Sequence, residues 1–71
     1  MDRQLIFTAQ QVADLAGVST QAIYKAWAAG KFPSSIRFGK TYMLYRADVA
    51  TWLYKRGQRL EDIEKERRDN E

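Results

Sequence analysis

Residues 12–30, VADLAGVSTQAIYKAWAAG, hold two segments with the apolar spacing of helices and a short break between them. In the first segment, the apolar residues that share one helix face are Val12, Ala13 and Ala16. Gly17 suits the left-handed conformation that ends a helix, and Ser19 is a favoured N-cap residue for the next one. The stretch therefore predicts two helices joined by a tight turn, with the second helix over about 20–29.

The flanking residues support both helix boundaries. Thr8 and Gln11 form a Thr-x-x-Gln capping box, which predicts that the first helix begins after Thr8. The apolar triplet at 5–7 precedes this box and is long enough for a short strand. Gly30 predicts the end of the second helix, and Pro33 blocks its continuation.

The next segment, residues 36–45, has the pattern of a β-hairpin. Residues 36–38 alternate apolar and polar side chains, 39–41 can turn, and 42–45 are an aromatic and apolar returning strand. Because a two-stranded hairpin is marginal alone, we expect its apolar residues to pack on the helices: Ile36, Phe38, Tyr42 and Leu44. The strand at 5–7 could complete the sheet of this hairpin.

The rest of the chain divides into a third helix, which begins near Arg46, and a charged tail. The apolar face of this helix holds Val49, Trp52 and Leu53. Gly57 interrupts it, and the mostly charged residues after it predict a solvated, fraying helix. The fold class is therefore mostly α with a small antiparallel β-hairpin (α+β). We expect a winged helix-turn-helix domain at 1–57 and a mildly acidic, helical or frayed tail at 58–71.

The composition of the 71-residue chain limits the classes of function. Its length allows one domain with a small core. The chain has no cysteine and no histidine, which excludes disulfides, thiolate or imidazole metal sites and the usual catalytic triads. It also lacks a glycine-rich phosphate loop and a plausible pair of catalytic carboxylates. We therefore expect no enzyme activity, no catalytic residues, no cofactor and no bound metal.

Hydropathy and charge indicate a cytoplasmic protein with a polyanionic partner. No apolar run approaches the ~18–20 residues of a membrane span, and the first residues lack the pattern of a signal peptide, so no membrane partner is expected. The net charge is +3, but residues 1–57 carry eight Lys/Arg and three Asp/Glu, whereas 58–71 carry four and six. A small basic domain with a mildly acidic tail favours a polyanion as its partner.

The second predicted helix has the features of a helix that enters the major groove of DNA. Its outward face is free of bulky apolar residues, and Thr20, Gln21, Tyr24, Lys25 and Ala28 fall on or near it. A glutamine can pair with adenine, and a threonine can hydrogen-bond a base while its methyl group meets a thymine methyl. The N–H groups that follow Ser19 suit a phosphate, and Lys25 can neutralise another.

Most of the chain, residues 5–54, resembles the excisionase and AlpA type of small winged helix-turn-helix proteins, which are relatives of the MerR DNA-binding domain. The resemblance rests on the order and spacing of short motifs: the Thr-led first helix, Gly17-Val18-Ser19, Ile23-Tyr24-Lys25, Gly30 with Phe32-Pro33, Ile36-Arg37-Phe38-Gly39, and Asp48-Val49 with Trp52. It implies that the second helix reads the major groove of double-stranded DNA and that the hairpin, as a wing, lies on the backbone or minor groove.

The resemblance and the residue chemistry together give the expected DNA-binding residues: Ser19, Thr20, Gln21, Tyr24, Lys25, Arg37, Lys40 and Thr41. Family members commonly have a basic residue at the position of Thr20 and an arginine at that of Thr41. One monomer is therefore expected to bind weakly and to depend on cooperation with neighbouring copies. The resemblance also implies DNA bending, and a role as an excisionase (a recombination directionality factor) or as a small regulator of prophage transcription.

Several alternatives stay open at this point. Trp27 and Trp52 are interpreted as core residues on apolar helix faces, and the alternative is a platform for base stacking. The tail is either a solvated helix or a handle for a neighbouring copy or an integrase. The whole chain could instead be a DNA-packaging adaptor like the small subunit of a phage terminase, or a protein-interaction module that has lost DNA binding.

Overall fold

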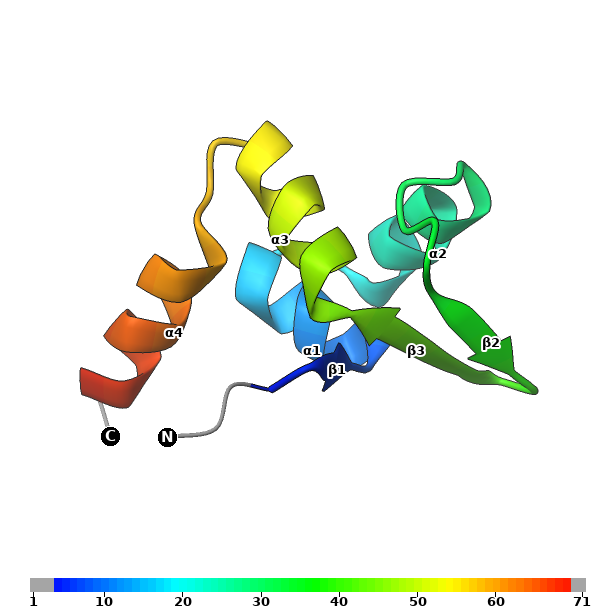
Figure 1. Ribbon diagram of the computed structural model, residues 1–71, viewed down its shortest axis with the longest axis horizontal. Helices are drawn as coiled ribbons and strands as arrows, with labels where there is room; N and C mark the ends of the chain where they lie inside the picture. The colour runs from blue at the N-terminus through cyan, green and yellow to red at the C-terminus, as the bar shows by residue number, and fades with distance from the viewer. Residues whose placement is uncertain (1–3, 70–71) are drawn as a thin grey trace.

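The computed structural model describes residues 4–69, with side chains up to Arg67. Within these residues, four helices and three short strands make a mixed α+β fold (Figure 1). In chain order the elements are β1 (Ile6–Phe7), α1 (Ala9–Ala16), α2 (Thr20–Ala28), β2 (Ile36–Phe38), β3 (Thr41–Tyr45), α3 (Arg46–Lys55) and α4 (Leu60–Asp69). The β2–β3 hairpin projects from the helices as a wing (Figure 1). The predicted winged helix-turn-helix fold is confirmed.

The caps of α1 and α2 form where the sequence predicts them. Thr8 Oγ1 accepts a hydrogen bond from the backbone N–H of Gln11 at 3.1 Å, and Gln11 Oε1 accepts one from the N–H of Thr8 at 2.9 Å. Gly17 ends α1 with a φ of 73°, in the left-handed region that glycine adopts without strain. Ser19 Oγ accepts from the N–H of Ala22 at 3.3 Å and so caps α2.

The capping box allows a test of how strongly local interactions fix α1. Thr8→Ala removes the oxygen that accepts from Gln11, so the free energy of unfolding is expected to fall by about 1 kcal/mol. Urea denaturation followed by circular dichroism measures this change. Thr8→Ser keeps the oxygen and is expected to stay within about 0.5 kcal/mol of the parent chain. Equal losses in both variants would contradict the capping role.

The three strands form one antiparallel sheet in the order β1–β3–β2. A two-residue loop, Gly39-Lys40, connects β2 to β3, because Phe38 pairs directly with Thr41. Gly39 has a φ of 60° and Lys40 has no positive φ, which is the pattern of a type II′ hairpin turn. The short strand before the helices therefore completes the sheet of the hairpin, as the sequence predicts.

The core lies between the helices and one face of the sheet. The largest fully buried side chains come from α1, α2, β3 and α3: Val12, Ile23, Leu44, Val49 and Leu53. Trp27 and Trp52 are half-buried and pack against these residues, which confirms their interpretation as core residues. Trp52 also contacts the buried Phe32 from the loop after α2, with ring centroids 5.5 Å apart.

The prediction that both hairpin strands pack on the helices is wrong for β2. Ile36 and Phe38 are 43% and 72% exposed, whereas Leu44 of β3 is fully buried. The physical reason is the length of the turn. A three-residue turn at 39–41 would place Ile36 and Phe38 on the face of Leu44, but the two-residue turn pairs Phe38 with Thr41. This shift of one residue moves both side chains to the opposite face of the sheet.

The tail forms a helix, α4, from Leu60 to Asp69, and this helix packs on the rest of the fold. Leu60 is 3% exposed within the core, and Ile63 is half-buried against it. Arg46 of α3 donates two hydrogen bonds to the Glu64 carboxylate, at 2.6 and 3.0 Å, and this ion pair raises the pKa of the Arg46 guanidinium. The predicted helix is present as α4, whereas the expectation of a solvated helix does not hold for Leu60 and Ile63, because these apolar residues share the face that meets the core. Residues 70 and 71 lie outside the described part.

Candidate nucleic-acid interface

Helix α2 is held by one face and exposes the opposite one. Ile23 is fully buried in the core, while Gln21 and Lys25, which are four residues apart on the helix, are exposed. Thr20, at the first position of the helix, is half-buried. The exposed face thus presents an amide and an ammonium group to solvent on a helix whose position the core fixes.

The N-terminus of α2 is also open to solvent. Ser19 is exposed, and its hydroxyl accepts a hydrogen bond from Ala22 in the first turn of its own helix. This cap satisfies one of the first-turn N–H groups, and the others lie at the positive end of the helix dipole. Such an end favours an anion such as a phosphate.

An aromatic cluster joins α2 to the hairpin. The Tyr42 ring of β3 lies 4.7 Å from the Tyr24 ring and 5.2 Å from the Trp27 ring, measured between centroids. The Trp27–Tyr42 pair is edge-to-face, which is a preferred geometry for aromatic rings. From the hairpin side, the Arg37 guanidinium lies over Tyr42 at 5.5 Å from the ring centroid, as a cation–π contact. These four residues form what we call the Tyr42 junction, which fixes the hairpin relative to α2.

Sequence reasoning placed Tyr42 among the residues that pack on the helices but did not include it in the site. The signal for its role was present, because Tyr42 and Leu44 are two residues apart and therefore face the same side of a strand. Tyr24 is among the expected DNA-binding residues. It is 40% exposed while its ring packs on Tyr42, so it belongs to the junction and is still open to solvent.

The tip of the hairpin carries the remaining predicted residues. Lys40 in the turn and Thr41 at the start of β3 are both exposed. Arg37 is exposed as well, and its Nε donates a hydrogen bond to the Gly39 carbonyl oxygen at 2.8 Å. This bond and the contact with Tyr42 orient the guanidinium, which carries further N–H donors of the kind that bind phosphates and base edges.

The electrostatic character of this region is set by a segment without acidic residues. Residues 15–47 contain five basic residues and no Asp or Glu: Lys25, Lys31, Arg37, Lys40 and Arg46. Arg46 is paired with Glu64, on the side of α4. The next carboxylate along the chain, Asp48, accepts a hydrogen bond from the Ser34 backbone N–H at 2.7 Å. Helix α2 and the hairpin therefore form a positively charged surface, the electrostatic footprint expected for binding a polyanion.

The predicted site residues all lie on these two elements or the α2 N-cap. The α2 group is Ser19, Thr20, Gln21, Tyr24 and Lys25, and the hairpin group is Arg37, Lys40 and Thr41. The structure brings Tyr24 and Arg37 together, because both contact Tyr42. The other six predicted residues lie on the same elements but outside the Tyr42 junction. All six are exposed except Thr20, which is half-buried.

Among residues 4–69, no group of three or more Asp, Glu, His or Cys side chains is placed to hold a metal ion. Over the same residues, no helix is both long enough and apolar enough to span a membrane. An open pocket between the end of α2 and α3 includes Lys31, Asp48 and Trp52 in its lining. Its one carboxylate is already bonded to Ser34, so the pocket offers no converging acid–base pair.

Comparison with known proteins bears on these observations. Searches of curated proteins and of solved structures found no significant match. A protein-family model described as a helix-turn-helix domain matches residues 6–57, which covers most of the chain from β1 to the end of α3. The chain therefore belongs to this family of small helix-turn-helix DNA-binding domains, a membership that supports sequence-specific DNA binding in general.

Proposed function

We propose that this chain is a non-enzymatic, sequence-selective DNA-binding protein of phage or mobile-element type. In this proposal it acts as an excisionase, a recombination directionality factor, or as a small regulator of prophage transcription. The observation that carries the DNA-binding part is the Tyr42 junction, which joins the exposed face of α2 to a basic hairpin. A helix and a wing that are held together can contact two neighbouring parts of one duplex at the same time.

The proposed docking places α2 in the major groove and the hairpin on the backbone or minor groove. Gln21 and Thr20 meet base edges, since a glutamine amide can pair with adenine and a threonine methyl can contact thymine. Lys25 and Tyr24 contact phosphates beside the helix, and the helix N-terminus at Ser19 receives another. The wing contacts come from Arg37, Lys40 and Thr41.

Residues 1–57 form the DNA-binding unit of this proposal, which acts in the cytoplasm on double-stranded DNA. Neighbouring copies bind adjacent sites cooperatively and bend the duplex between them. The tail binds a partner, for which an integrase is the candidate. It does so through its charged surface, because Leu60 and Ile63 already pack on the core of the same chain.

Selection from a random duplex library at near-physiological salt, read by sequencing, tests the proposal. Enrichment of a defined motif supports sequence-selective binding. Repeated motifs at a regular spacing support cooperative assembly on adjacent sites. Absence of any enrichment would overturn the proposal and favour a DNA-packaging or protein-interaction role.

Gln21→Ala is expected to change the base preference at one position of the selected motif by about 1–3 kcal/mol, because one side chain reads one base pair. The same selection, repeated with the variant, measures this change. Gln10→Ala is a matched control, since Gln10 is an exposed glutamine on α1 that bonds to Asp14. The control should select the parent motif, and an unchanged motif for Gln21→Ala would mean that α2 does not read bases in this way.

A further inference from the structure

The sheet has an apolar face that residues 4–69 leave largely uncovered. Residues directly opposite each other in an antiparallel pair lie on the same face of the sheet. Ile6 is opposite Tyr45 and Ile36 is opposite Met43, and the period of two along β2 adds Phe38 to the same face. Thr41 is opposite Phe38 and lies on this face too, at its polar end beside the hairpin turn. We call the five apolar and aromatic residues of this face the outer sheet face: Ile6, Ile36, Phe38, Met43 and Tyr45.

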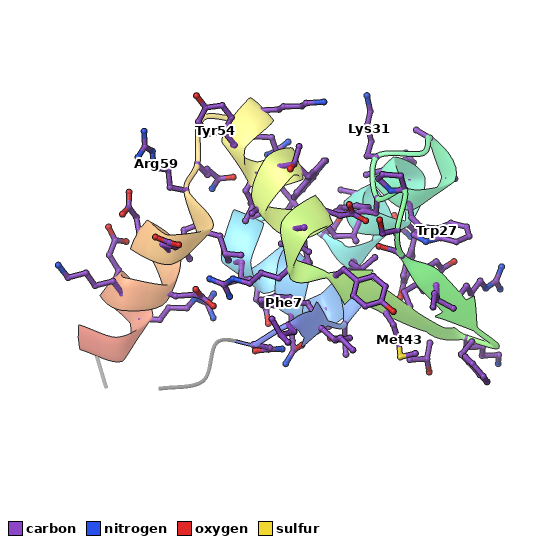
Figure 2. All side chains as sticks on the ribbon, in the orientation of Figure 1. Phe7, Trp27, Lys31, Met43, Tyr54 and Arg59 are labelled. Atoms are coloured by element: carbon purple, nitrogen blue, oxygen red, sulfur yellow. The ribbon has the colours of Figure 1, made fainter. Side chains whose placement is uncertain are left out.

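The outer sheet face is accessible. Ile6 is 45% exposed and Phe38 is among the most exposed large apolar side chains described, while Met43 and Tyr45 are half-buried. Figure 2 shows Met43 pointing from β3 away from the helices. The opposite face of the sheet contributes Leu44 to the core, so in the described part of the chain the buried cluster lies on the other side of the sheet.

We propose that the outer sheet face binds the same face of a second copy of this chain, with the two copies related by a two-fold axis. The proposal rests on the proposed function, because it identifies the contact through which neighbouring copies cooperate on DNA. The tail is a weaker candidate for that contact, since the apolar residues described in α4 are occupied by the core of their own chain.

Charge is the first argument for a second copy as the occupant. The chain has a net charge of +3, and α2 and the hairpin tip are basic, so two copies that met through those surfaces would repel each other. The outer sheet face has no charged residue, which lets two equally charged molecules approach there. An apolar face is also self-complementary, as a two-fold symmetric interface requires.

The available area is the second argument, because it matches transient rather than permanent pairing. Five side chains on three short strands offer on the order of a few hundred Å², the size of the largest apolar patch on ordinary monomers. A stable interface of standard size buries about 800 Å² per partner. We therefore expect monomers in dilute solution and pairing when two copies sit on adjacent DNA sites, where the effective concentration is of millimolar order.

The symmetry of the contact has a consequence for the DNA site. Two copies related by a two-fold axis present their α2 helices in opposite directions, so the preferred site is an inverted repeat of the half-site. A head-to-tail row of copies would instead use two different surfaces and select direct repeats. The arrangement of repeats in the selected sequences therefore reports on the surface that pairs.

Phe38→Thr tests the contact, with Tyr54→Gln as its control. The two aromatic side chains are 72% and 67% exposed, but Tyr54 is on α3 and lies away from the hairpin (Figure 2). On a duplex with two half-sites, the parent and Tyr54→Gln should bind the second copy at least about tenfold more tightly than a lone half-site is bound. Phe38→Thr should lose this cooperativity and keep its affinity for a lone half-site within about twofold of the parent.

Three results would overturn this pairing: unchanged cooperativity in Phe38→Thr, selection of direct repeats, or a large loss of affinity of Phe38→Thr for the lone half-site. The last result would show that this face contacts DNA instead. If the parent chain bound no duplex at all, the proposed function would fail. The pairing of two copies would then be tested by crosslinking in the absence of DNA.

That measurement uses the absence of cysteine from the chain, since Met43→Cys places a single thiol on the outer sheet face. Two sheets packed face to face lie about 10 Å apart, a distance that a short bis-maleimide spans. At high protein concentration, Met43→Cys is expected to give crosslinked dimers in much higher yield than Tyr54→Cys. Equal yields from the two variants would overturn the pairing.

Discussion

Combining Lys25→Ala, Arg37→Ala and Lys40→Ala is expected to weaken binding to a selected duplex by roughly 100-fold near 0.15 M salt. Each cation that neutralises a phosphate releases a counterion and contributes about 0.9 to the slope of log K against log salt concentration. The triple variant should therefore show a slope about 2.7 smaller than the parent. Fluorescence anisotropy with a labelled duplex over a series of salt concentrations measures the affinity and the slope.

A second triple variant controls for net charge. Lys55→Ala, Arg59→Ala and Lys65→Ala remove the same charge from α3, from α4 and from the loop between them, and all three side chains are exposed. Figure 2 shows Arg59 at the side of the molecule away from the hairpin. Charges that touch no phosphate attract the DNA only at long range, where salt screens them. The affinity of this control for the duplex is therefore expected to fall by about fivefold or less. Similar losses in both triple variants would mean that net charge alone attracts the DNA.

The helices could be predicted from the sequence because their boundaries depend on neighbouring residues. The capping box of Thr8, the glycine at 17 and the cap at Ser19 all act within a few residues of the helix ends that they define. The candidate DNA-binding residues came instead from residue chemistry together with the family resemblance. They lie on α2, its N-cap and the hairpin, and the DNA contacts assigned to them stay predictions.

The orientation of β2 could not be predicted in the same way, because it depends on a single residue in the turn. The segment 39–41 is compatible with a turn of two or of three residues. Because side chains alternate between the two faces of a strand, this difference of one residue decides which face of the sheet the β2 side chains occupy. The two-residue turn observed here exposes Ile36 and Phe38, which the sequence alone assigned to the core. The outer sheet face was missed for this reason.

Tyr42 was expected to pack on the helices, but its partners Tyr24, Trp27 and Arg37 and the docking of Leu60 were not predicted, because these contacts join separate parts of the chain. Tyr42 contacts α2 only once β3 is placed against the helices, and local sequence does not specify that arrangement. Leu60 lies in a segment that is almost wholly charged, and composition favours solvent for such a segment. In the structure α4 docks through Leu60 and Ile63, and the Arg46–Glu64 ion pair forms beside them.

Leu60→Ala is expected to lower the free energy of unfolding by about 2–4 kcal/mol at 25 °C, because it removes a fully packed side chain and leaves a cavity between α4 and the core. Leu60 is 3% exposed. A domain of this size has a stability near the low end of the usual range of about 5–15 kcal/mol, so this one change would remove a large share of it. Urea denaturation followed by circular dichroism measures the loss.

Lys65→Ala is the control on the same helix, since Lys65 is exposed and its truncation is expected to change the stability by less than about 0.5 kcal/mol. A loss confined to Leu60→Ala would mean that the folding unit extends beyond residue 57, where the family match ends. Deletion of 58–71 would then lower stability, so its effect on DNA binding would have to be measured well below the melting temperature of the truncated chain. An unchanged unfolding midpoint for Leu60→Ala would mean that α4 adds nothing to the core, and the deletion would then report on partner binding alone.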